Sequence, residues 1–205
     1  QIRANEIKYN EISKILKATG NVRITNLNED FVLKSDEVLY ILKLAKIESN
    51  TPSQIIDILG NTIKTKNFIY LLNDNLIKLN SINIKDKENN ITKIDMAYLD
   101  LNQNKLSGKD ISIDLNNKSF QKDNEPRIKG NTILVTDSNT IIGKGVFTNC
   151  KKNDDCPPWQ MSAKEIKHDK KKKTINYKNA WLKIYDVPVL YFPKFFHNIR
   201  LVYWT

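Results

Sequence analysis

The sequence predicts an all-β protein, because short apolar segments alternate with polar residues at a period of two. The alternation is clear in segments such as 82–84 and 111–113. Polar turn residues separate these segments, for example at Asn73-Asp74-Asn75. Helical periodicity is poor, and only residues 53–59 admit a helical turn. This pattern favours strands with one apolar and one polar face.

A repeat of roughly 30 residues organises the chain. Each unit opens with an apolar residue, a spacer and usually an aromatic or apolar residue. A second apolar segment follows, often introduced by glycine, as in residues 20–24 and 108–113. Each unit therefore reads as strand, turn, strand, which favours stacking of each unit on its neighbours. The leading residues of six copies, separated by 31, 30, 28, 37 and 33 positions, are Ile7, Val38, Phe68, Met96, Ile133 and Ile166.

Stacking would join the apolar rows of the units into one inner face. The stacked strands would form two sheets with their apolar rows facing each other. If the two sheets pack together, this face is an ordinary core. If they stay apart, it is an apolar groove. Periodicity alone favours the core. The residues predicted to point inward are Ile7, Tyr9, Val22, Ile24, Val38, Tyr40, Phe68, Tyr70, Ile82, Ile84, Met96, Tyr98, Ile111, Ile113, Ile133, Val135, Val146 and Leu182.

The composition limits the classes of partner. With 40% hydrophobic and 27% charged residues, the chain is too apolar for a disordered protein. No run approaches the roughly 20 apolar residues of a spanning helix. The net charge of +10 comes mainly from lysine, and Asn and Ile are also abundant, which we interpret as the joint bias of an AT-rich coding background. A nucleic-acid module would need aromatics among basic residues on an exposed face. Tyr9, Tyr40 and Tyr70 instead share the inward row, so no nucleic-acid partner is expected.

The sequence predicts neither catalysis nor a bound metal. Asp95, Asp100, Asp110 and Asp114 occupy turn-adjacent and outward positions, as a solvated face would have them. The two cysteines are too few for a zinc site, and the histidines are not placed to complete one. No cofactor is expected. A carbohydrate-active β-solenoid enzyme is an alternative, which would require acidic clusters facing inward or into a cleft.

The C-terminal third resembles a known family. A Cys-Pro-Pro-Trp element at 156–159, an Asn-Ala pair at 179–180 and the run Val-Pro-Val-Leu-Tyr-Phe-Pro at 187–193 occur in this order. They resemble the LptD (OstA) family of lipopolysaccharide-assembly proteins. Residues 4–24 resemble the OstA-like repeat of the periplasmic N-terminal domain. The resemblance is specific over 156–196 and looser before that.

This resemblance implies a repeat-built β-jellyroll: an open, groove-forming stack of short antiparallel strands. The domain would occupy residues 1–186, and residues 187–205 would begin the connection to a C-terminal barrel missing from this chain. It would lie in the periplasm at the outer membrane. There it would receive lipopolysaccharide from an LptA-like jellyroll at its N-terminal edge strand and guide the acyl chains to the barrel. An LptE-like lipoprotein would bind that barrel. A bridge component similar to LptA or LptC is the alternative within this lipid-transport class.

The resemblance also bears on Cys150 and Cys156. The periplasm permits disulfides, so we expect a disulfide between these cysteines, with free thiols as the alternative. The best-known family members instead link cysteines of this domain to the barrel. The tail from His197 to Thr205 departs from the family, where His-Pro would be expected, and it receives no role.

Overall fold

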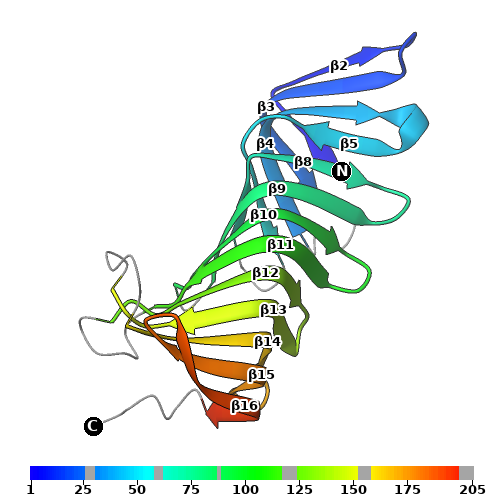
Figure 1. The fold of residues 1–205 in the computed structure, drawn as a ribbon. Helices are drawn as coiled ribbons and strands as arrows, with labels where there is room; N and C mark the ends of the chain where they lie inside the picture. Colours follow the sequence, from blue (N-terminus) through cyan, green and yellow to red (C-terminus); the bar gives the residue numbers. More distant parts are fainter. Residues whose placement is uncertain (26–30, 58–61, 87–88, 117–123, 152–157, 199–205) are drawn as a thin grey trace. The chain divides into compact units, whose positions relative to one another are not determined.

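The chain is all-β, as its sequence predicts. A computed structural model describes every residue except 26–30, 58–61, 87–88, 117–123, 152–157 and 199–205. The described residues form sixteen strands and one short 3-10 helix, Leu42–Leu44. All the registered strand pairs are antiparallel, as at β3–β4, β8–β9 and β14–β15 (Figure 1).

The chain divides into two compact units. The first comprises Gln1–Lys87 and Lys93–Asn104, and the second comprises Glu88–Thr92 and Lys105–Thr205. The strands of the first unit, with β10 lying mostly in it, are β1 (Ile2–Arg3), β2 (Glu6–Asn10), β3 (Ile15–Thr25), β4 (Phe31–Ile41), β5 (Lys46–Ser49), β6 (Ser53–Asp57), β7 (Thr62–Thr65), β8 (Asn67–Leu71), β9 (Leu76–Lys85) and β10 (Ile91–Asp100).

The second unit is a meander in which each strand pairs with the next. Its strands are β11 (Lys105–Asp114), β12 (Arg127–Val135), β13 (Asn139–Thr148), β14 (Trp159–Asp169), β15 (Thr174–Ile184) and β16 (Val187–Asn198). The strands are longer than the short ones we expected. β16 pairs with β15 and continues the sheet beyond residue 186, where we expected the connection to a barrel to begin.

Long strands bend near their midpoints, where one residue adopts a left-handed backbone conformation. Asn21, Ser81, Asp110, Lys144 and Asn179 all have φ between 50° and 54°. This left-handed conformation is costly for most residues and least costly for glycine and asparagine. The sequence suggested that the second apolar segment of each repeat is a separate strand that follows a turn. In the structure it is instead the second half of one long strand, on the far side of the bend.

The short strands of the first unit follow the same plan. β1 and β2 both pair with β3, while β5 and β6 both pair with β4. Each such pair replaces one long strand that is interrupted near the bend. The helical turn considered for residues 53–59 is wrong where the structure describes it. Ser53–Asp57 is β6, and its Ile55 side chain is fully buried between β4 and β7.

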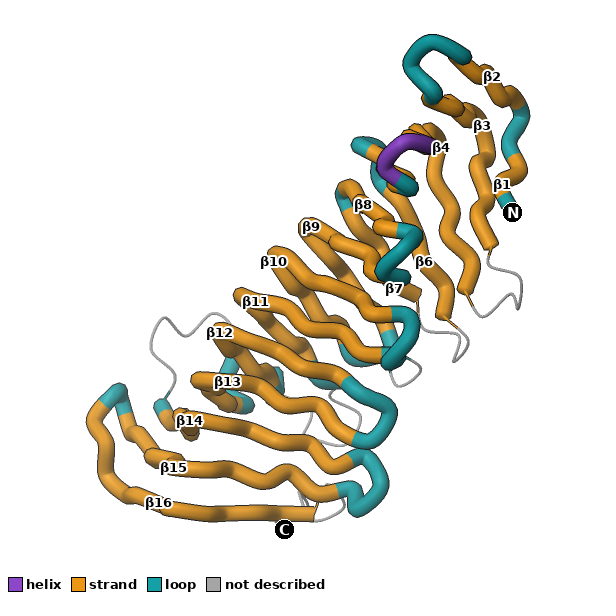
Figure 2. Tube along the Cα trace, turned by 90° about the vertical axis from the view of Figure 1, so that its right-hand side faces the viewer, coloured by secondary structure: helices purple, strands orange, loops and turns teal. Residues whose placement is uncertain are grey.

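Asparagine and aspartate side chains close several hairpin turns. Asn10, Asp100 and Asp169 each accept hydrogen bonds through Oδ1 from the backbone N–H groups two and three residues later, at 2.9–3.1 Å. Successive turns are also linked, since the N–H of Leu72 donates to the carbonyl of Ala45 at 2.9 Å. Figure 2 shows these turns in teal at the strand ends.

Candidate functional site

Each bent strand contributes to two facing walls of its unit. In the second unit, the turn-side wall is built from the strand halves that meet at the hairpin turns 136–138 and 170–173. The loop-side wall is built from the opposite halves. Across each bend, successive inward positions lie three residues apart, as Ile142 and Gly145 do on β13. One bent sheet therefore encloses an apolar interior.

Most of the predicted lining residues lie on this inner face. Ile7 and Tyr9 pair with Ala18 and Leu16 of the inward row, although both are about half exposed because β2 is a terminal strand. The other inward residues are buried or half-buried: Val22, Ile24, Val38, Tyr40, Phe68, Tyr70, Ile82, Ile84, Ile111, Ile113, Ile133, Val135 and Leu182.

Three predicted lining residues point outward instead: Met96, Tyr98 and Val146. On β10 the buried positions are Ile94, Ala97 and Leu99. After the bend, the inward residues are therefore Ala97 and Leu99, each one position beyond the residue that we expected to point inward. Tyr98 is consequently 36% exposed. Val146 follows the bend at Lys144 and pairs with Lys129 and Ser162 on the outer face. Period-two reading fails at a bend because the alternation shifts there.

The interior of the second unit is closed beside the bend. A Cβ added to Gly145 would lie 2.6 Å from Cδ1 of Ile166, and one added to Gly130 would lie 2.4 Å from Cγ2 of Ile142. Both isoleucines are buried. The two glycines therefore permit the isoleucines of the turn-side wall to pack against the loop-side wall beside the bend.

The interior of the first unit is closed as well. Phe31, at the start of β4, meets Tyr70 of β8 edge-on, with ring centroids 6.0 Å apart. Both rings are nearly fully buried. The phenol of Tyr70 donates a hydrogen bond to Oδ1 of Asn75 at 3.2 Å, and burial raises the pKa of this phenol. At this level the walls of the first unit are packed against each other.

A buried hydroxyl cluster interrupts the apolar interior of the first unit. Ser35 Oγ lies 2.9 Å from Ser49 Oγ and 3.0 Å from Thr51 Oγ1, and Ser53 Oγ donates to it at 3.0 Å. The three serines are buried. We did not predict this cluster from the sequence. Its only signal was the placement of small hydroxyl residues where the alternation called for apolar ones.

Burial decreases along one inner row of the loop-side wall of the second unit. Pairing joins Ile113, Ile128, Phe147, Met161, Leu182 and Leu190 into one row across β11 to β16. The first two are buried, the next three are half-buried, and Leu190 is 49% exposed. We call the half-exposed members, Phe147, Met161, Leu182 and Leu190, the open apolar row. This row is the accessible part of the predicted lining.

Few charges enter the interior. In the first unit, Lys8 pairs with Glu6, Lys17 with Glu37 and Lys46 with Glu48. Burial raises the pKa of the Tyr177 phenol well above its ordinary value. Within the described ranges, no cluster of histidine, cysteine and carboxylate side chains is arranged to hold a metal ion. The surfaces available to a ligand inside the second unit are therefore mainly apolar.

Cys150 is half-buried, with Sγ 3.7 Å from the carbonyl oxygen of Trp159. The guanidinium of Arg127 donates hydrogen bonds to the carbonyls of Cys150 and Lys151. These contacts position the chain where it leaves β13. The expected partner, Cys156, lies outside the described residues, so their disulfide stays a prediction.

Comparisons with known proteins give no assignment. No protein-family model matches the chain, and no curated protein is significantly similar to it. In the part of the chain that the structure describes, no helix has the length and apolarity needed to cross a lipid bilayer.

Proposed function

We propose that this domain carries lipid, receiving the acyl chains of lipopolysaccharide and guiding them toward the outer membrane. The observation that carries the proposal is the open apolar row, together with the inward rows from which it continues. Transferring a methylene out of water is worth about 0.8 kcal/mol. A carrier of acyl chains therefore needs an apolar lining that a chain can reach, and this row supplies one.

The resemblance of residues 156–196 to the LptD family gives the lipid its proposed identity and location. It suggests lipopolysaccharide as the cargo and the periplasm as the compartment. Because the interior beside the bend is filled by packed side chains, we place the proposed lipid contact at the open apolar row of the second unit. In the second unit, Met161, Leu182 and Leu190 of the open apolar row offer an inner apolar surface that is already partly exposed.

Photo-crosslinking tests this proposal. We would place a photoreactive residue at Met161 or Leu182 of the open apolar row and expose the protein to lipopolysaccharide. Matched outward controls are Ser112, Tyr98 and Val146, which lie on strands of the same fold with the opposite orientation. Crosslinks should form at the inner positions only. Equal yields at inner and outer positions would refute the proposal.

The N-terminal edge is the proposed docking site for an upstream jellyroll similar to LptA. On β2, Ile7 and Tyr9 are 49% and 47% exposed and continue the inward row. Their strand pairs with β3 on one side only. An unpaired edge of this kind can accept a strand from another chain. The inner faces of the two jellyrolls would then be continuous.

The carbohydrate-active alternative has less support. It requires inward or cleft-facing acidic side chains, whereas Asp95 and Asp110 are exposed on the outer surface. Incubating the purified protein with polysaccharides and measuring the release of reducing ends tests this alternative directly. Cleavage would replace the lipid-carrier proposal.

A further inference from the structure

The outer face of the last two strands carries an exposed aromatic pair. Trp181 of β15 and Tyr191 of β16 are cross-strand neighbours, with ring centroids 4.9 Å apart. They are 42% and 43% exposed. Val189, which has no registered partner on β15 because of a bulge, is 50% exposed nearby. The outer face of an antiparallel sheet is normally polar, so this group needs another explanation.

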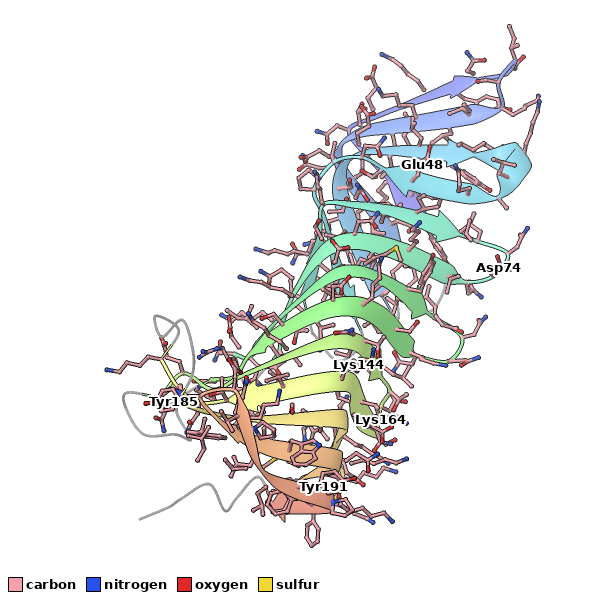
Figure 3. All side chains as sticks on the ribbon, viewed as in Figure 1. Glu48, Asp74, Lys144, Lys164, Tyr185 and Tyr191 are labelled. Carbon is pink, nitrogen blue, oxygen red and sulfur yellow. The ribbon has the colours of Figure 1, made fainter. Side chains whose placement is uncertain are left out.

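Lysines lie on the bend side of the aromatic pair, on the same outer face. Lys178 and Lys194 are directly paired across β15 and β16, although like charges in this position repel each other. Lys164 lies at the bend of the adjoining β14, and Figure 3 labels it together with Tyr191. All three lysines are exposed, and none has an ion pair with a described carboxylate. We call these lysines with Trp181, Val189 and Tyr191 the aromatic–lysine face.

Hydrogen bonding fixes the polar end of this face. The phenol of Tyr191 donates to Oδ1 of Asn179 at 3.0 Å, so its oxygen lies toward the bend and the lysines. An apolar ring with a polar tip directed at a basic rim suits the boundary between lipid headgroups and acyl chains. Tryptophan and tyrosine are enriched at that boundary, and lysines there attract anionic headgroups.

We propose that the aromatic–lysine face binds the surface of an anionic phospholipid bilayer. Trp181, Tyr191 and Val189 would enter the headgroup region, while Lys164, Lys178 and Lys194 would contact lipid phosphates. The charge argues for this occupant, because Lys164, Lys178 and Lys194 leave the face net positive although Glu165 of β14 is the cross-strand neighbour of Lys178. Insertion is shallow, since Asp186 is exposed at the tip of the hairpin and opposes deeper burial. This proposal is independent of the lipid-carrier proposal, which concerns the inner face.

Vesicle co-sedimentation of the whole chain tests the proposal. The wild-type protein should bind vesicles of phosphatidylcholine containing a minority of phosphatidylglycerol. It should bind pure phosphatidylcholine vesicles much less, and added salt should weaken binding to the anionic vesicles. Trp181→Ala should weaken anionic-vesicle binding at least about tenfold, which corresponds to about 1.4 kcal/mol. Lys164→Gln and Lys194→Gln should each weaken it and reduce its salt dependence.

Two further variants separate binding from folding. Val189→Ser removes an exposed side chain that has no registered cross-strand partner, so it should weaken binding without lowering the melting temperature. Tyr98→Ala is the matched control, because Tyr98 is an exposed aromatic residue on the outer face of β10 and is not part of the aromatic–lysine face. Its vesicle binding should equal that of the wild type.

Three results would overturn the proposal. Equal binding of wild-type protein to neutral and anionic vesicles would remove the role of the lysines. Wild-type binding by both Trp181→Ala and Val189→Ser would show that the aromatic pair only stabilises the hairpin. Absence of vesicle binding, together with self-association that Trp181→Ala abolishes, would make the face an interface between copies of this chain.

Discussion

Replacing Gly145 with alanine should destabilise the second unit, because the new methyl group has no space. Its Cβ would lie 2.6 Å from Cδ1 and 2.9 Å from Cγ1 of Ile166, which is fully buried, and 3.2 Å from Cγ2 of Ile142. Overpacking of this kind costs about 1–3 kcal/mol. Restricting the unfolded chain returns about 0.4–1 kcal/mol. We therefore expect a net loss of about 1–2 kcal/mol in the free energy of unfolding, measured by urea denaturation.

Two companion variants identify the cause. Ile166→Val removes Cδ1, the closest atom, and alone should cost about 0.5–1.5 kcal/mol. The double variant should lose clearly less stability than the sum of the losses of the two single variants, because the shortened side chain of residue 166 makes room for the methyl group. Gly143→Ala meets only Oγ1 of the exposed Thr132 at 2.4 Å, which can rotate away. It should leave stability nearly unchanged. Wild-type stability of Gly145→Ala would mean that the walls do not touch beside the bend.

Further predictions concern the tyrosines, the N-terminal edge and the cysteines. Burial raises the pKa of Tyr177 and Tyr70, so the unfolded chain releases these protons first as the pH rises past the ordinary tyrosine pKa of about 10. Stability should then fall with increasing pH, and Tyr177→Phe should reduce that alkaline loss in denaturation curves; an unchanged loss would contradict the assignment. Ile7→Pro should abolish binding to an LptA-like jellyroll with little change in melting temperature, and binding at wild-type affinity would exclude β2 as the docking edge. Mass spectrometry of unreduced protein made in the periplasm should find Cys150 bonded to Cys156, whereas alkylation of both without reduction would exclude the bond.

The repeat and its alternation were sufficient to predict the all-β class and most of the inner face. Val22, Phe68 and Ile133 could be assigned because each lies in a segment where the period of two is uninterrupted. The errors cluster at the bends. Met96, Tyr98 and Val146 were misplaced because a strand that bends shifts its inward positions by three residues instead of two or four. The sequence carries this signal only weakly, as Ser81 and Lys144 adopt the same left-handed conformation as Asn21 without being glycine or asparagine.

Closure of the interior was harder to predict than its location, because closure depends on contacts between residues far apart in the sequence. Phe31 and Tyr70 meet across the first unit although 39 positions separate them. In the sequence, Gly130 interrupts the apolar pattern of its strand. The structure gives the reason, because the side chain of Ile142 occupies the space that a side chain at position 130 would need. Sequence patterning specifies which face points inward, whereas the size of paired side chains on opposite walls decides whether that face becomes a core or a groove.

The two units should therefore differ in how they respond to an acyl chain. In the first, an entering chain would have to separate Phe31 from Tyr70, and it would lose the contacts of two buried rings before gaining its own. In the second, a chain lying along Leu182 and Leu190 would cover surface that is already partly in water. Covering apolar surface contributes about 25 cal/mol per Å², and here no packed contact opposes it. We expect initial lipid contact at β14 to β16, with entry into the first unit requiring its walls to separate.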